Sequence, residues 1–175
     1  MMFWDNSDMD RSKSIQLLNR AVADELQAVH QYMYFHFHLD DQGFGPLSLL
    51  LKRIAIMEMG HIELLAERIL FLKGDVKMEP AGPVEKIVEP EAILAKAMAM
   101  EEDGVRSYNQ AAMKCAAAAD SASKQLFERL VGDEESHYDL FEKQLDNIKR
   151  FGPNYLALQS FGAGESPAGA APAGN

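Results

Sequence analysis

Two short motifs of the same kind can bind metal in this 175-residue sequence. Glu58-x-x-His61 and Glu134-x-x-His137 are its only matches to a Glu-x-x-His pattern. Residues three positions apart lie on one face of a helix, so each pair can aim a carboxylate and an imidazole at the same point. Each motif is therefore a candidate chelating pair for a metal ion.

Two further glutamates make these motifs part of a repeat. Glu25 precedes Glu58 by 33 residues, and Glu101 precedes Glu134 by the same 33. The matched intervals predict two similar helical hairpins that hold all four carboxylates at mid-height. Four ionised carboxylates would be too costly to bury there unless cations compensate them, and two divalent ions match their formal charge. The sequence predicts a two-metal centre formed by Glu25, Glu58, His61, Glu101, Glu134 and His137.

The ligand types limit which metals are suitable. Oxygen and imidazole ligands without a thiolate favour iron or manganese, and zinc could also occupy such a site. A single Glu-x-x-His on a helix is more often a solvated or core pair, so the prediction depends on two motifs with matched upstream glutamates. Cys115 is the only cysteine and is interpreted as a small buried helix residue.

The elements that position these residues are predicted to be helices. Good helix formers dominate the sequence and β-branched residues are few, so we expect an all-α protein. Apolar periodicity, first-turn prolines and capping residues predict four long helices and a short fifth one after Gly152-Pro153. The long helices are expected at about residues 8–41, 46–72, 90–119 and 121–150.

One long connection joins the two hairpins. Residues 75–89 contain Pro80, Gly82 and Pro83 and are predicted to be non-helical. About 15 extended residues span about 50 Å, more than the roughly 42 Å of a 28-residue helix, so the connection can cross the whole bundle. We expect one domain over residues 1–161 and a disordered tail over 162–175, where Gly, Ala, Pro and Ser predominate.

Charge and apolar content limit the partners. A formal net charge of -10 argues against nucleic acid or an anionic membrane surface, because both require a basic face. No apolar run reaches the roughly 18 residues of a membrane span, and the N-terminus lacks a signal-like pattern. A cytoplasmic protein is expected.

The arrangement resembles a known metal-binding pattern. One Glu from each of two helices, with Glu-x-x-His from the other two, is similar to the ferritin-like di-iron pattern. The resemblance is closest to bacterioferritin and covers about residues 11–160. The segments that carry it are Glu25 to Tyr32, Glu58 to Leu72, Met100 to Gly104, Asp133 to His137 and Asn154 to Leu156.

The resemblance implies a fold and an activity. The fold would be a ferritin-like four-helix bundle with a long crossover and a short fifth helix. The activity would be that of a ferroxidase and iron store, in which oxygen or hydrogen peroxide oxidises Fe(II) at the six ligands and ferric mineral collects in a 24-subunit shell. Tyr32 matches a tyrosine near the family's centre and would supply an electron; its interpretation as an ordinary core tyrosine stays open.

A second apolar stripe follows the helix that carries Glu58. Ala55, Met59, Ile62 and Ala66 recur at 4-3-4 spacing, and Met59 lies about 100° from Glu58 and about 160° from His61 around the helix. We expect the stripe to be exposed in one chain and covered by a second copy across a two-fold axis. Two facing Met59 side chains could ligate a haem iron, although methionine in such a stripe is more often a packing residue.

The resemblance favours haem, because Met59 matches the haem-ligating methionine of bacterioferritins. It implies a homo-oligomer built from haem-bridged dimers, with electrons for iron release arriving from a ferredoxin-type reductant. The porphyrin type, the physiological oxidant and the route of iron from the centre to the storage cavity stay open.

Some positions depart from the family pattern. Arg53 and Met57 stand where some bacterioferritins have a His and an Asp that form an inner-surface iron site, so that site is predicted to be missing. Leu140 stands where some relatives have Trp. A di-iron peroxidase or oxidase resembling rubrerythrin is an alternative, weakened by the lack of Cys-x-x-Cys. A helical scaffold without metal ranks last.

Overall fold

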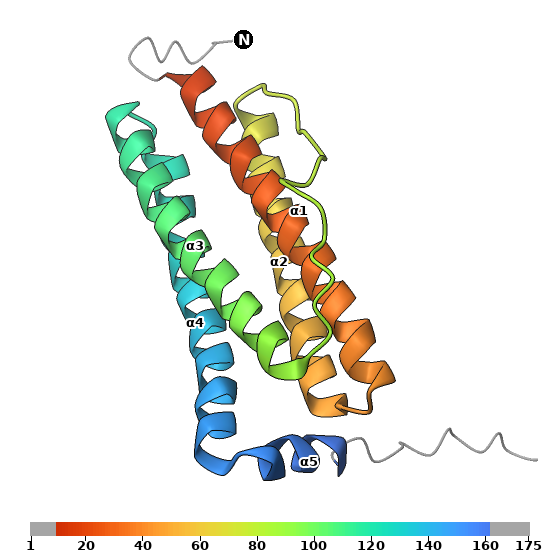
Figure 1. Cartoon of the computed structure of the whole chain (residues 1–175). Coiled ribbons are helices and arrows are strands. Elements are labelled where there is room, and N and C mark those ends of the chain that lie inside the picture. Colours follow the sequence, from red (N-terminus) through yellow and green to blue (C-terminus); the bar gives the residue numbers. More distant parts are fainter. Residues whose placement is uncertain (1–9, 162–175) are drawn as a thin grey trace, which may run out of the picture.

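The protein is a bundle of four long helices with a fifth across its end (Figure 1). The computed structural model describes residues 10–161, and within them it contains five helices and no strand. No helix in this range is both long and apolar enough to cross a membrane. The all-α prediction is confirmed, and the predicted tail lies outside the described residues. The helices are α1 (Arg11–Asp41), α2 (Gly45–Phe71), α3 (Pro90–Ala117), α4 (Ser121–Phe151) and α5 (Pro153–Phe161).

Local signals set the helix ends much as the sequence predicts. The Asp10 carboxylate accepts a hydrogen bond from the backbone N–H of Lys13, which caps α1. Pro90 opens α3, and the side chain of the preceding Glu89 caps it. Asp120 caps α4 and also receives a hydrogen bond of 2.6 Å from Arg68 on α2. The third cap thus joins the two hairpins as well as beginning a helix.

The end of α2 shows a division of roles between two adjacent residues. Lys73 takes the left-handed conformation, with φ of 67°, which glycine usually supplies at a helix end. Gly74 is needed for a different reason, because a Cβ added there would lie 2.8 Å from the Ile15 side chain of α1. The predicted end of this helix near residue 72 is confirmed, and Gly74 allows the chain to approach α1 closely.

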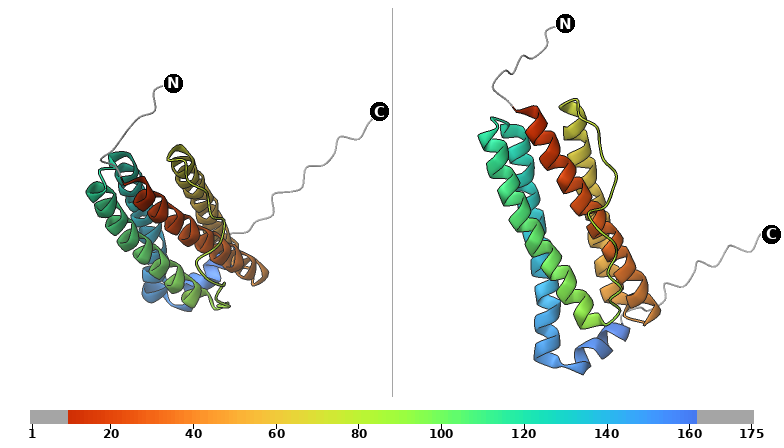
Figure 2. Two further views of the ribbon diagram at one scale, coloured as in Figure 1. Left: turned by 90° about the horizontal axis from the view of Figure 1, so that it is seen from above. Right: turned by 45° about the horizontal axis from the view of Figure 1, so that its top comes forward.

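The connection from α2 to α3 runs along α1 for most of its length (Figures 1 and 2). Amide side chains on α1 and just after its end hold it by hydrogen bonds to its backbone, at 2.8 to 3.0 Å. The predicted crossing of the bundle is confirmed. The bonded pairs are Asn19 with Asp75 and Lys77, Gln27 with Gly82 and Pro83, Gln31 with Glu85, and Gln42 with Val88.

The hydrophobic core has two parts, separated along every long helix. One cluster, which includes Phe35 and Phe141, lies toward α5, and the other, which includes Leu18 and Phe127, lies toward the opposite end. Cys115 belongs to the second cluster and is fully buried, as predicted. The stretch of each helix between the two clusters carries the candidate metal ligands, so apolar packing encloses them from both sides.

Candidate metal centre

All six candidate ligands converge at mid-bundle. Their exposed fractions are 5% or less. They form two groups of four whose ligand atoms lie within 4.8 Å of one another, and Glu58 and Glu134 belong to both groups. We call the first the His61 site and the second the His137 site. The His61 site comprises Glu25, Glu58, His61 and Glu134, and the His137 site comprises Glu58, Glu101, Glu134 and His137.

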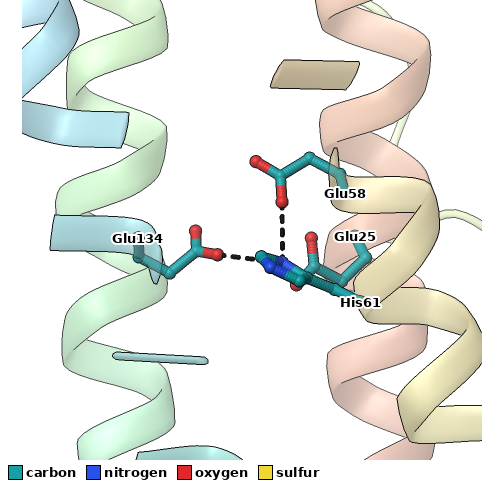
Figure 3. A group of neighbouring side chains, drawn as sticks. All are labelled: Glu25, Glu58, His61 and Glu134. Carbon is teal, nitrogen blue, oxygen red and sulfur yellow. Dashed lines mark hydrogen bonds and ion pairs between the residues drawn. The ribbon is translucent and has the colours of Figure 1, made fainter. Parts of the chain in front are cut away.

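In the His61 site, three carboxylates surround one imidazole nitrogen (Figure 3). Nδ1 of His61 lies 2.8 Å from Glu58 Oε2, 3.1 Å from Glu25 Oε1 and 3.3 Å from Glu134 Oε1. One nitrogen can donate only one strong hydrogen bond, so at least two of these oxygens gain little from it. The four atoms bracket a point at which a cation would contact all of them.

The His137 site has a similar arrangement on the other side of the shared glutamates. Nδ1 of His137 lies 3.0 Å from Glu58 Oε1 and 3.5 Å from Glu101 Oε2. The imidazole rings of His61 and His137 are stacked, with centroids 5.9 Å apart and planes 20° apart. The two sites therefore lie side by side, with the shared Glu58 and Glu134 common to both.

The hydrogen-bond inventory tests whether metal fits this donor set. Buried polar atoms almost always have a hydrogen-bond partner. Here several fully buried atoms have none, and all but two of the unpartnered buried side-chain atoms among residues 10–161 belong to the centre. The unpartnered atoms of the centre are both oxygens of Glu58, Glu101 Oε2, Glu134 Oε1 and both ring nitrogens of His137. Metal ions at the two sites would satisfy all of them except Nε2 of His137, because it is Nδ1 of this residue that faces the shared glutamates. The residues therefore fit a di-metal cofactor.

Without metal, several of the buried carboxyl and imidazole groups of the centre retain protons at neutral pH. Burial raises the pKa of Glu25 to about 8 and that of Glu134 to about 9. Burial opposes a charged imidazole, but the carboxylates around each ring favour it more strongly and raise the pKa of His61 to about 12 and that of His137 to about 10. Metal binding must displace these protons, so it is coupled to their release.

Two buried tyrosines donate hydrogen bonds to Glu25 and Glu101, the glutamates that belong to only one site, and each tyrosine lies on the opposite hairpin. The Tyr32 hydroxyl on α1 donates to Glu101 on α3, and the Tyr108 hydroxyl on α3 donates to Glu25 Oε1 on α1 at 2.7 Å. Burial, followed by the nearby glutamates, raises the pKa of both phenols well above its usual value. Sequence analysis identified Tyr32 but missed Tyr108. The repeat contained the signal, because each tyrosine follows a ligand glutamate by seven residues.

Gly104 is a second residue that the sequence analysis missed. It lies on α3, one turn beyond Glu101, and a Cβ added to it would meet Glu134 Oε2 at 2.8 Å. The absence of a side chain therefore makes room for a carboxylate shared by both sites. Spacing along α3 alone gave no sign of this contact, because it arises between two helices.

A cavity of about 380 Å³ gives access to the centre from the side of α1 and α3. Both tyrosines line it, as do two of the ligand glutamates, Glu25 and Glu134. Charged side chains such as Arg106 also line it. An ion or a small molecule that enters this cavity reaches carboxylates of the His61 site directly.

Comparison with known proteins agrees with this geometry. The model of the ferritin-like domain family matches residues 15–151. Bacterioferritin from Desulfovibrio desulfuricans is 37% identical over 155 residues, which cover 87% of this chain and 85% of that protein. Bacterioferritin from Rhodobacter capsulatus is 36% identical over 148 residues, covering 84% and 91%. This chain belongs to the bacterioferritin family.

Solved bacterioferritins share the fold. The D. desulfuricans structure, whose diiron site is described in different catalytic states, superposes with a TM-score of 0.85 at 35% identity and covers 94% of this chain and 95% of its own. The R. capsulatus structure gives 0.83 at 34% identity, covering 90% and 98%. That structure has a metal-free dinuclear site and heme iron in a crystallographic special position. The predicted resemblance and the ferritin-like fold are both confirmed.

The second apolar stripe predicted on α2 has fewer exposed members than expected in this bacterioferritin-family chain. Met59 is 56% exposed and lies about 100° around α2 from the buried Glu58. Ile62 and Ala66 are half-buried, but Ala55 is only 1% exposed and belongs to the core. Including Ala55 in an exposed stripe was wrong, because it lies three residues before Glu58 and shares its buried face.

Other large apolar side chains are also exposed on α2, over a wide arc around the helix. Five large ones have exposed fractions between 46% and 70%. Such an accumulation on one helix is typical of a surface that another subunit covers. They are Leu49, Ile56, Met57, Leu70 and Phe71.

Proposed function

We propose that this chain stores iron and that its two sites form a ferroxidase centre, with Fe(II) as the substrate. The main support is the pair of buried four-residue groups that share Glu58 and Glu134. Several of their candidate ligand atoms have no hydrogen-bond partner. The family comparison supports the same function. In this proposal the six converging residues would hold the ions, and Glu58 and Glu134 would contribute to both sites.

Bound iron would supply the electrons that reduce oxygen or hydrogen peroxide. The residues of the chain have other tasks. The four glutamates compensate the charge of two divalent ions, which would otherwise be costly to bury. The two histidines fix the ions beside the shared carboxylates. Both groups are buried between apolar clusters, which limits access to the centre along the bundle axis.

Tyr32 is proposed to donate an electron to the centre. Its hydroxyl donates a hydrogen bond to Glu101, a ligand of the His137 site. Glu101 Oε1 accepts this hydrogen bond, so an acceptor for the phenolic proton is already in contact with the hydroxyl. An electron that leaves the phenol can therefore be accompanied by its proton, which moves to Glu101, and no charge is left on the buried ring.

Haem is proposed to bind between two copies of the chain, with Met59 from each as an axial ligand. Met59 is exposed on an apolar face of α2, and soft sulfur ligands suit haem iron. A crystallographic special position lies on a symmetry element, and the heme iron of the R. capsulatus relative occupies one. The resulting dimers would build a 24-subunit shell that stores the mineral, and a ferredoxin-type reductant would release iron through the haem.

The native mass, the visible spectrum and iron retention test this proposal together. We expect a shell-sized assembly with haem bands that oxidises Fe(II) and keeps the ferric product. Met59→Leu should remove the haem bands and leave Fe(II) oxidation nearly unchanged. Met113→Leu, at another exposed methionine, on α3, is the matched control and should change neither. A colourless dimer that oxidises Fe(II) without retaining iron would instead identify a di-iron peroxidase or oxidase.

A further inference from the structure

The two candidate metal sites differ in the group that contacts Nε2 of the histidine, the ring nitrogen that faces away from the shared glutamates. Nε2 of His61 lies 3.4 Å from Oδ2 of Asp133, a half-exposed carboxylate on α4. Nε2 of His137 is buried and has no partner. Both histidines turn Nδ1 toward the shared glutamates, so in both cases Nε2 is the nitrogen left for an outer partner.

The difference follows from one position of the internal repeat. Asp133 immediately precedes the shared glutamate Glu134, and the corresponding residue before Glu58 is Met57. A thioether is a poor acceptor for an imidazole N–H, whereas a carboxylate is a strong one. The α4 hairpin thus supplies an outer partner for His61, and the α2 hairpin supplies none for His137.

The glutamate that belongs to only one site is supported in the same way in each. Glu25 receives a hydrogen bond from Tyr108, and Glu101 receives one from Tyr32. Asp24, next to Glu25, is paired with Arg20 at 3.3 Å and adds little net charge. The outer partner of the histidine is the difference between the sites that acts directly on a ligating imidazole.

We infer that the two metal sites of this chain are unequal, and that Asp133 is a positioning residue that makes the His61 site the tighter one. A carboxylate on the second ring nitrogen fixes the orientation of a ligating histidine and increases its basicity. Loss of such a partner typically weakens metal binding about 10- to 100-fold. The inference rests on the proposed function, because it takes both groups as metal sites.

Titration of the metal-free protein with Co(II), followed by calorimetry and visible absorption, tests the inference without measuring turnover. We expect two binding steps of one ion each, with dissociation constants about 10- to 100-fold apart. Asp133→Ala should weaken the first step by that factor and merge the two. Asp133→Asn keeps an oxygen acceptor and should lie between. Asp146→Ala, also at an exposed acidic position on α4, is the control and should leave both steps unchanged.

A gain of binding makes the test independent of damage to the fold. Met57→Asp places a carboxylate at the equivalent position of the other hairpin and should tighten the second step about tenfold. Anomalous scattering from a half-loaded crystal should locate the first Co(II) beside His61. Equal dissociation constants for the two Co(II) ions in the unaltered protein would overturn this inference but not the proposed function. An unchanged first binding step in Asp133→Ala would do the same. Failure to bind Co(II) at all would overturn the proposed function and the inference with it.

Discussion

The hairpins α1–α2 and α3–α4 match closely where they face the metals and differ where they face outward. Each supplies a glutamate, a Glu-x-x-His pair 33 residues later and a tyrosine seven residues after the first glutamate. Each tyrosine crosses to the glutamate of the other hairpin. Matching positions along two hairpins thus produce a nearly symmetric centre, because equivalent helix positions meet at the same height.

The outward residues at equivalent positions have different neighbours. Met59 gives α2 an exposed apolar side chain, and the equivalent Glu135 on α4 is exposed and charged. Gly104 makes room for Glu134, and its counterpart on α1 is Ala28. The comparison teaches that a common centre constrains only the side chains that reach it. The residues one step away are adjusted separately on each hairpin.

The largest expected effect distinguishes shared ligands from unshared ones. Glu134→Gln should reduce the metal content from two ions per subunit to none, because Glu134 belongs to both sites. Glu25→Gln should leave one ion, in the His137 site, which does not contain Glu25. Equilibrium dialysis with Co(II) measures both.

Stability provides the control for this pair of variants. Burial raises the pKa of Glu134 to about 9, so the metal-free carboxyl is already neutral at pH 7. Glutamine reproduces its shape and charge, and the Tm of the metal-free protein should change little. Retention of one ion by Glu134→Gln would show that this glutamate serves only one site.

The next largest effect is expected at Gly104 on α3, whose equivalent on α1 is Ala28. Gly104→Ala brings a Cβ to 2.8 Å from Glu134 Oε2, so the carboxylate must move. A displacement of about 1 Å at a reacting centre costs up to about 100-fold in rate, so we expect Fe(II) oxidation to slow at least tenfold. Stopped-flow absorbance measures the oxidation rate.

Gly132→Ala is the matched control on α4. No atom lies within 4 Å of the added Cβ, and the position is exposed. The helix gains about 1 kcal/mol from replacing glycine, which urea unfolding detects, and the oxidation rate should not change. An oxidation rate in Gly104→Ala equal to that of the unaltered protein would mean that Glu134 relaxes without leaving the metals.

Local signals explain why much of the fold and the ligand set could be predicted. Prolines and capping residues such as Pro90 and Asp120 act within one helical turn, so the sequence shows them directly. The convergence of the candidate ligands was predictable because equal spacing places them at equal heights. The buried position of Ala55 and the contact of Gly74 with Ile15 depend on how helices pack, and spacing along one helix does not contain that information.

The smallest effect compares the two tyrosines in the metal-free protein. Tyr108→Phe removes one donor from Glu25 Oε1, but Nδ1 of His61 still lies 3.1 Å from that oxygen. Tyr32→Phe removes the partner of Glu101 Oε1, and Glu101 Oε2 already has none. A buried group left unpartnered costs about 1–3 kcal/mol, whereas a replaceable bond contributes about 1 kcal/mol.

We therefore expect Tyr32→Phe to lower the free energy of unfolding by about 1 kcal/mol more than Tyr108→Phe does. Urea unfolding of both metal-free variants measures the difference. Tyr138→Phe is the control, because its hydroxyl is exposed and lies 3.4 Å from Glu142, and it should change stability by less than about 0.5 kcal/mol. Equal losses at Tyr32 and Tyr108 would mean that His61 gives Glu25 no effective support. The metal-free centre would then be as symmetric in energy as its ligand spacing is in sequence.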